Sequence, residues 1–185
     1  MPEKIVEGNR KSHRPLRDSR PRLSGRSKLD IRNRYSRQKI SANFGARLRL
    51  FIYRHFIAKC RAPSIAEMAK RFRSRKEVDA ALQRLCASHA FVLQENGELW
   101  RAAPFSAVPT AFPVKVGNRS YYGNCIWDAL GIPAMLHQDA RIDASCGCCN
   151  LEMLLKVENG RLLGSKGLIH IAVPARDWYK DIVFT

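Results

Sequence analysis

Two side chains of the sequence, Cys125 and Asp128, have the types and the spacing that proton transfer at a soft metal needs. If this stretch is helical, a separation of three residues places both side chains on one face, with roughly 5–6 Å between their Cβ atoms. Asn124 precedes them in a position to cap the helix, and a helix N-terminus lowers the pKa of a thiol placed there. Soft metals prefer a thiolate as ligand, and a neighbouring carboxyl group can deliver or accept a proton. The same spacing also fits a small buried cysteine beside an exposed helix acid.

A second group of thiols lies downstream in the run Cys146-Gly147-Cys148-Cys149. The Cys-x-x-Cys spacing within it is half of a typical zinc site, but such a site needs four ligands and the sequence has no second Cys-x-x-Cys pair. The residues that would have to complete a zinc site are Cys125, His137 or His170. A redox pair and a mercury-capturing pair are two other interpretations. The predicted metal-ligating residues are Cys125, Cys146, Cys148 and Cys149, with structural zinc as an alternative.

The elements in the first half of the chain are predicted from apolar periodicity and capping patterns. Residues 46–60 are apolar enough for a helix that is buried on most sides. Ser64 and Ser74 are each followed three residues later by glutamate, the capping-box pattern that opens a helix. Asn96-Gly97 between two apolar runs indicates a hairpin over residues 91–100. Three helices followed by a hairpin is the order of a winged helix.

Basic residues concentrate in the first half, because the net charge is +9 over residues 1–40, +7 over residues 41–101 and +1 over residues 102–185. Such asymmetry is compatible with nucleic-acid contact. In a DNA-binding winged helix, the third helix would present four polar side chains to the groove, namely Arg75, Lys76, Gln83 and Arg84. The other interpretation is a solvated surface, with residues 1–44 as a basic flexible arm rich in Arg, Ser, Pro and Gly.

The second half is predicted to be mostly antiparallel sheet with small helices. Strands are expected over residues 112–116, 120–122, 141–145, 151–157 and 168–173. A short helix is expected over residues 124–130 and should stop before Gly131 and Pro133. We therefore predict an α+β fold in three parts: the basic arm (1–44), a winged-helix-like domain (45–103) and a small, mainly antiparallel sheet domain (104–185).

Length and composition narrow the class of protein. The 185 residues are 45% hydrophobic, which is enough to bury a core and argues against global disorder. No stretch approaches the roughly 18 apolar residues that a membrane-spanning helix needs. The N-terminus lacks the apolar segment of a secretory signal, so we expect a cytoplasmic protein without membrane contact. In that reducing compartment the six cysteines are not expected to form a disulfide framework.

The run of residues 112–150 resembles the central part of the organomercurial (alkylmercury) lyase family. The matching segments are Ser120-Tyr121-Tyr122, Cys125-x-x-Asp128, the Ala-Leu-Gly-Ile-Pro-Ala stretch of residues 129–134, and Ala140-Arg141-Ile142 leading to Ser145-Cys146. A looser similarity continues through Ala172-Val173-Pro174. Because the family carries a winged-helix-like N-terminal region, the resemblance extends over about residues 45–185.

The resemblance implies protonolysis of a carbon–mercury bond, which releases a hydrocarbon and leaves Hg(II) on thiols. In that reading Cys125 matches the first catalytic thiol, Asp128 the proton-handling acid and Cys146 a cysteine regarded as structural. The substrates would be organomercurials and the role detoxification, with no required cofactor and with Hg(II) bound as product. Residues 104–185 would form the catalytic domain.

The chain departs from the family pattern at its end. The family's second catalytic thiol lies just after the strand that begins here with Ile182-Val183-Phe184, and the sequence stops at Thr185. We therefore expect a C-terminally truncated or degenerate relative, in which Cys148 or Cys149 would substitute only if their loop folds back toward Cys125. Two alternative functions remain: a non-catalytic mercury- or zinc-binding relative, and a winged-helix DNA-binding protein that senses metal.

Overall fold

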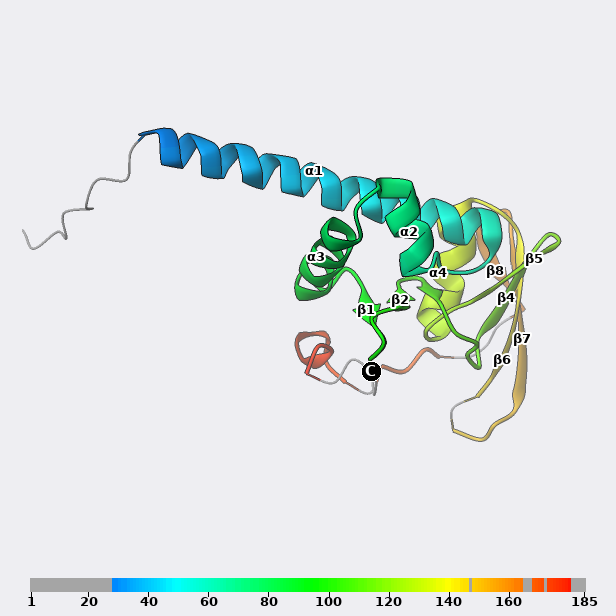
Figure 1. The fold of residues 1–185 in the computed structure, drawn as a ribbon. Coiled ribbons are helices and arrows are strands. Elements are labelled where there is room, and N and C mark those ends of the chain that lie inside the picture. Colours follow the sequence, from blue (N-terminus) through cyan, green and yellow to red (C-terminus); the bar gives the residue numbers. More distant parts are fainter. Residues whose placement is uncertain (1–27, 147, 165–167, 172, 181–185) are drawn as a thin grey trace, which may run out of the picture. The chain divides into compact units, whose positions relative to one another are not determined.

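The computed structural model describes residues 28–146, 148–164, 168–171 and 173–180 (Figure 1). By its internal contacts the chain divides into residues 1–37 and residues 38–185. Of the first unit, the structure describes only the start of one helix. All other described elements belong to the second unit, which carries the core and the candidate site.

Helix α1 (Lys28–Lys59) begins inside the segment predicted to be a flexible arm. Residues 28–44 contain neither proline nor glycine, so nothing in the backbone interrupts a helix that continues into the apolar residues after them. Further along, α1 contributes to the core at every fourth position, through Leu48, Ile52 and Phe56. The expected arm was therefore wrong for residues 28–44, and its remaining residues lie outside the described part of the chain.

Helices α2 (Ile65–Phe72) and α3 (Arg75–Ala87) begin at the two predicted capping serines. The Ser64 hydroxyl accepts the Glu67 N–H while the Glu67 carboxylate accepts the Ser64 N–H, which is a complete capping box. At α3 the Ser74 hydroxyl accepts the Glu77 N–H, so the serine half of the box is confirmed there. Each such cap stabilises its helix by about 1 kcal/mol.

A three-stranded antiparallel sheet follows, in the order β1 (Val92–Leu93), β2 (Leu99–Ala102) and β3 (Phe105–Ser106). The predicted hairpin is confirmed at β1 and β2, and Gly97 in its turn has a φ of +83°, which disfavours any side chain. The Glu98 carboxylate accepts the Ile65 N–H at 2.9 Å, which ties the hairpin to the start of α2.

The second sheet has five antiparallel strands in the order β5-β4-β6-β7-β8. Their bounds are β4 Pro113–Val116, β5 Arg119–Tyr122, β6 Ala140–Ser145, β7 Glu152–Glu158 and β8 Arg161–Leu163. Buried and less buried positions alternate along β4 and β6, where Val114, Val116, Ala140, Ile142 and Ala144 face the core. The alternation fixes the register, because a slip of one residue would turn every apolar side chain of a strand outward.

The strand predicted over residues 168–173 was wrong for the residues that the structure describes there. The last strand of the sheet is instead β8, which directly follows a turn at Asn159-Gly160. An apolar run alone does not distinguish a strand from an irregular segment that covers a pocket, and Leu168 is 98% exposed. The strand expected from Ile182 lies outside the described residues.

Helix α4 (Ile126–Leu136) packs on the second sheet and continues past Gly131 and Pro133, where the sequence predicted its end. An internal proline removes a backbone hydrogen bond and costs roughly 3 kcal/mol. Here Ile132 and Pro133 are both buried, and Gly131 lies against Pro104, where an added Cβ would be 3.3 Å from the proline Cβ. Burial of Ile132 and Pro133 therefore outweighs the lost hydrogen bond.

A continuous apolar core connects the helices of the first half to the sheet of the second. The Phe105 ring stacks on Phe56 of α1 with 5.2 Å between centroids and is tilted against Tyr121 of β5 at 5.5 Å. The Ile57 carbonyl on α1 accepts hydrogen bonds from the Arg119 side chain at 2.9 Å and from the Tyr121 hydroxyl at 3.0 Å. The α+β fold class is confirmed, and the domain boundary drawn at residue 104 stays a prediction.

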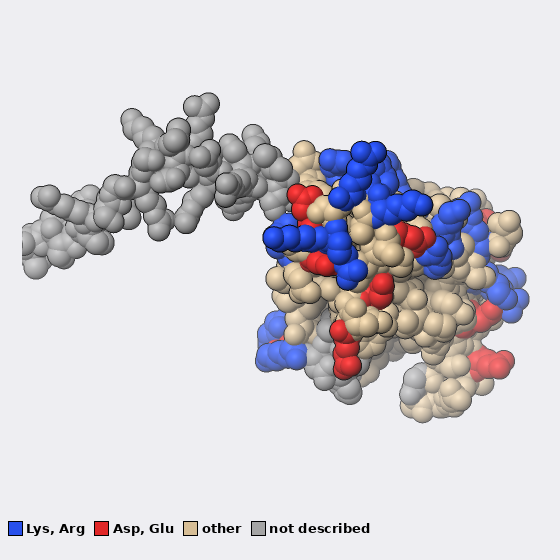
Figure 2. Space-filling model, viewed as in Figure 1, with Lys and Arg blue, Asp and Glu red and all other residues tan. Residues whose placement is uncertain are grey.

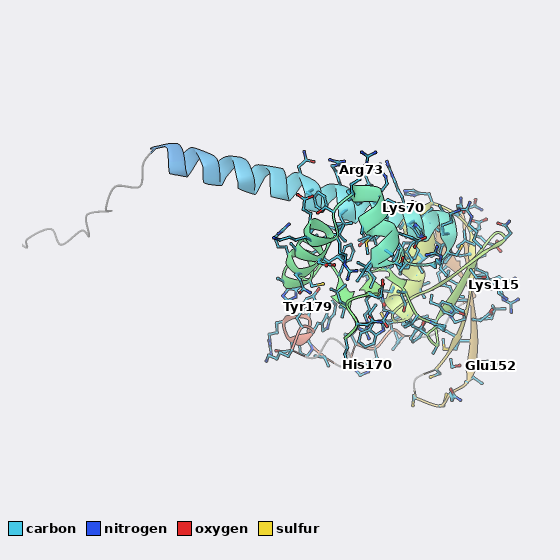
Figure 3. All side chains as sticks on the ribbon, in the orientation of Figure 1. Lys70, Arg73, Lys115, Glu152, His170 and Tyr179 are labelled. Atoms are coloured by element: carbon cyan, nitrogen blue, oxygen red, sulfur yellow. The ribbon has the colours of Figure 1, made fainter. Side chains whose placement is uncertain are left out.

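Basic side chains gather over the helical part of the face shown in Figure 2, and Lys70 and Arg73 are labelled on it in Figure 3. The residues predicted for DNA contact are exposed on α3: Arg75, Lys76, Gln83 and Arg84. Arg75 is ion-paired with Asp79 at 2.8 Å, so part of its charge is already satisfied within the helix. DNA binding stays a prediction. Among the described residues, no helix is both long and apolar enough to cross a membrane.

Candidate active site

Cys125 and Asp128 lie together at the start of α4, as their spacing predicts. Cys125 is the N-cap residue of the helix, with φ −147°, rather than a residue of the first turn. Its carbonyl accepts the Ala129 N–H at 2.9 Å, so the helix begins directly after the thiol. The Cys125 sulfur faces the backbone N–H groups of Asp128 and Trp127 without the geometry of a cap hydrogen bond.

Gly123 fixes the turn that leads into Cys125. A Cβ on this residue would lie 2.6 Å from the Ala129 backbone nitrogen, closer than real side chains approach. The Gly123 carbonyl accepts the Thr110 hydroxyl at 2.6 Å, and its N–H donates to the Phe112 carbonyl at 3.0 Å. The thiol therefore follows a backbone segment that is hydrogen-bonded on both sides and allows no side chain.

Asn124 holds the carboxyl group of Asp128. Its Nδ2 donates to Asp128 Oδ2 at 2.7 Å and lies 3.4 Å from the Phe105 carbonyl oxygen. The sequence predicted Asn124 as the helix cap, but the cap is Cys125 and the asparagine side chain contacts the acid instead. Asn124 Oδ1 is buried and has no hydrogen-bond partner among the described groups. The carboxyl group is thus oriented beside the thiol.

Burial raises the pKa of both groups of this pair. For Asp128 burial is the largest effect on the pKa, and hydrogen bonding from Asn124 and the charge of Arg101 oppose it. For Cys125 burial is again the largest cause of the raised pKa, and the charge of Asp128 adds to it, while the nearby N–H groups and Arg101 oppose it. The predicted lowering of the Cys125 pKa was wrong, because burial outweighs the helix N-terminus here. Burial thus makes the Asp128 carboxylate a stronger base than a free aspartate, which suits it to take up a proton from the neighbouring thiol.

The two side chains lie in a pocket of about 520 Å³ with a mostly apolar lining. Sequence reasoning missed the other main contributors to this lining, which are Phe91, Arg101, Ile169, Ile171, Trp178 and Tyr179. They come from the residue before β1, from β2 and from the segment near the C-terminus, so no local spacing connects them to Cys125. A larger hollow of about 880 Å³ lies beside the other end of α4, but no cysteine lines it among the described residues.

The described residues between 168 and 180 form one wall of the pocket with little regular structure. They include the short 3-10 helix η1 (Ala175–Asp177). The Tyr179 ring stacks on His89 with 3.7 Å between centroids, and the Trp178 indole N–H donates to the Val173 carbonyl at 2.8 Å. These contacts hold the apolar side chains of this wall beside the thiol.

Comparison with known proteins concerns the same part of the chain. Residues 105–184 match the family model described as alkylmercury lyase. In this segment the chain is similar to the alkylmercury lyase family. A solved structure, described as the crystal structure of the mercury-bound form of MerB2, matches with a TM-score of 0.53 and 19% identity, covering 68% of this chain and 66% of that chain. The chain thus spans just under two thirds of that structure, and at this identity the match shows the fold. No curated protein matches the chain.

The segment matched by the family model contains all the cysteines that were predicted as metal ligands, but the structure does not bring Cys125 together with the other three. Cys146, Cys148 and Cys149 lie at the turn between β6 and β7, and none of them lines the pocket of Cys125. The condition under which Cys148 or Cys149 would substitute for a second pocket thiol, a loop folded back toward Cys125, is therefore not met in the described structure. No group of three or more His, Cys, Asp or Glu is arranged to hold a metal ion among the described residues. Of the histidines considered for zinc, His170 lines the pocket and His137 lines the larger hollow.

Proposed function

We propose that the segment matched by the family model cleaves carbon–mercury bonds by protonolysis, with Cys125 as the mercury ligand and Asp128 as the proton carrier. The observation that supports this most directly is a thiol and an oriented carboxyl group side by side in one apolar pocket. The family match and the fold of a mercury-bound relative agree with the proposal. A thiolate sulfur is a preferred ligand of a soft metal such as mercury, and an apolar wall can bind the organic group of the substrate.

The reaction needs two proton transfers through Asp128. In the first, the Cys125 sulfur binds the mercury of an organomercurial salt and its thiol proton passes to the Asp128 carboxylate. In the second, the carbon–mercury bond breaks, and its electron pair takes that proton from Asp128 to form the carbon–hydrogen bond of the released hydrocarbon. Mercury remains as Hg(II) on the Cys125 sulfur and keeps its original counter-ion as the second ligand, so atoms and charge balance.

Two further side chains support this sequence of steps. Asn124 donates to Asp128 and so fixes the carboxyl oxygen that carries the proton. Arg101 lines the pocket, and its positive charge favours the deprotonated forms of both Cys125 and Asp128. The positive charge of Arg101 thus stabilises the Cys125 thiolate and the Asp128 carboxylate when each has given up its proton.

Release of Hg(II) requires a second sulfur ligand. A small thiol from solution can supply it, because the pocket is open to the surface at Trp127, whose side chain is 63% exposed. We place the reaction in the cytoplasm, where such thiols are kept reduced. The biological role would be the detoxification of organomercurials.

The test is benzene release from a phenylmercury salt in the presence of excess small thiol, measured by gas chromatography. Removing the mercury ligand with Cys125→Ser should lower the rate at least about a thousandfold. The matched control is Cys148→Ser, which removes an exposed thiol outside the pocket and should keep the rate. Benzene release by Cys125→Ser at the rate of the unsubstituted chain would show that this thiol is not the mercury ligand.

One observation favours a second function, the capture of organomercurials without cleavage. Among the described residues that line the pocket, Cys125 is the single cysteine. Intact-protein mass spectrometry separates the two functions: capture leaves mercury with its organic group on Cys125, whereas cleavage leaves mercury alone. An adduct that keeps its phenyl group indefinitely, with no benzene in the headspace, would replace the lyase proposal by capture.

A further inference from the structure

The turn between β6 and β7 carries a compact group of thiols. It is closed by two backbone hydrogen bonds, from the Asn150 N–H to the Cys146 carbonyl and from the Cys146 N–H to the Leu151 carbonyl, both at 2.8 Å. Asn150 adopts the left-handed conformation, with φ +56°, that reverses the chain. These two hydrogen bonds therefore connect the described residues on the two sides of the turn.

Cys146 and Cys149 lie three residues apart in this turn. Cys146 is half-buried and Cys149 is exposed. Hydrogen bonding from the backbone N–H groups of Cys149 and Cys148, and from the Cys149 thiol, lowers the pKa of Cys146. Two cysteines three residues apart on a turn closed by backbone hydrogen bonds can direct both sulfurs to one ligand.

The hairpin beneath the turn makes this arrangement rigid. Six residue pairs connect β6 to β7, from Ala140 with Val157 to Ser145 with Glu152. Ala144 and Leu155 near the turn are buried against the core. Figure 3 shows Glu152, at the turn end of β7, well apart from His170 and Tyr179 of the pocket wall. The thiols of the turn are thus a second site, distinct from Cys125.

The turn offers a pair of thiols, and this number of ligands suits some metal ions and not others. Structural zinc takes four ligands, and no group of three or more metal-binding side chains is present among the described residues. A soft cation that is satisfied by two thiolates, such as Hg(II), fits a pair of cysteines. Binding would form two sulfur–mercury bonds and release the two thiol protons to solvent.

We propose that Cys146 and Cys149 form a chelating site for Hg(II) that is separate from the pocket of Cys125. The turn holds both sulfurs before the metal arrives, so the second sulfur binds at a high effective concentration. This site does not depend on cleavage in the pocket, and it would bind inorganic Hg(II) in a chain that has no lyase activity.

The test uses the full chain with Cys125→Ser, which removes the pocket thiol, in the presence of excess monothiol competitor. One equivalent of HgCl₂ should remain bound, and X-ray absorption should show two sulfur neighbours on mercury. Adding Cys149→Ser, at an exposed position, should weaken retention at least about a hundredfold, because the chelate is lost. Adding Cys148→Ser instead should leave retention unchanged.

Three outcomes would overturn the site. Retention could be unaffected by Cys149→Ser, it could fall equally with Cys148→Ser, or mercury could show a single sulfur neighbour from the protein. Because Cys146 is half-buried, Cys146→Ser could destabilise the fold. The thermal unfolding midpoint of this variant is therefore measured together with its mercury retention. Retention by a folded Cys146→Ser chain would also contradict the proposal.

Discussion

The pocket of Cys125 and the turn of Cys146 carry the same functional group in opposite surroundings. Burial raises the pKa of the pocket thiol, which lies beside a carboxyl group. Hydrogen bonding from backbone N–H groups lowers the pKa of the turn thiol, which lies beside other thiols. The first environment couples a sulfur to a proton carrier, and the second couples a sulfur to another sulfur. Surroundings, rather than the count of cysteines, decide whether a thiol takes part in proton transfer or only in binding.

The largest effect that separates the two regions is expected from Asp128→Asn. An amide cannot accept and return the proton, so benzene release should fall by about 10²–10⁴-fold, the range of a lost general acid–base group. Mercury binding by the turn should not change. Steady-state benzene production and HgCl₂ retention, measured on the same preparation, check both expectations. The exposed Asp139→Asn is the matched control, and equal losses in both variants would remove Asp128 from the mechanism.

The second effect concerns thiol reactivity without any substrate. At neutral pH, Cys146 should react with iodoacetamide at least about tenfold faster than Cys125, because the thiolate is the reactive form and burial suppresses it in the pocket. Timed alkylation followed by peptide mass spectrometry gives both rates in one sample. In denaturant the two rates should converge. Equal rates in the folded chain would contradict the electrostatic difference between the regions.

A smaller effect is expected from Arg101→Gln. The charge of Arg101 lowers the pKa of Cys125, so its removal should raise that pKa and slow Cys125 alkylation at fixed pH by about threefold. Cys146 serves as the internal reference, and Arg84→Gln on the exposed face of α3 is the control variant. A parallel change at both cysteines would indicate a general loss of structure instead.

The smallest effect lies in the pH dependence of stability. Burial raises the folded-state pKa of Asp128 above its unfolded value. The stability that this group contributes is therefore full below the unfolded pKa and is lost as pH rises through the folded pKa. From about pH 4 upward, the melting temperature of Asp128→Asn should fall less steeply, or rise more steeply, than that of the unsubstituted chain. If the melting temperatures of the two chains changed in parallel with pH, ionisation of the Asp128 carboxyl group would not destabilise the fold, which would contradict this prediction.

Features that local sequence determines were predicted well. Ser64 and Ser74 start helices because a hydroxyl and a free backbone N–H three residues later satisfy each other wherever the chain places them. Gly97 marks a turn because its backbone conformation excludes other residues. The proximity of Cys125 and Asp128 follows from helical geometry alone. The pair Cys125 and Asp128 is also one of the short segments that carry the resemblance to the alkylmercury lyase family.

Features that depend on distant parts of the chain were missed. Helix α4 passes Pro133 because the core covers Ile132 and Pro133, and no local rule contains that burial. The sequence also gave no sign that Arg101 or the residues after 168 would line the pocket, since their contacts with α4 arise only in the folded chain. The pKa of Cys125 was predicted in the wrong direction for the same reason, because burial is a property of the whole fold.

The ring of Phe105 and the carbonyl of Ile57 have a consequence for protein engineering and for gene fusion. The matched family segment begins at residue 105, yet its first side chain stacks on Phe56 of α1, and two side chains of β5 are hydrogen-bonded to Ile57. A transplanted cassette of residues 105–184 would expose that ring and leave those donors in water. The portable unit is therefore larger than the segment that sequence comparison defines, and a graft that works should carry α1 with it.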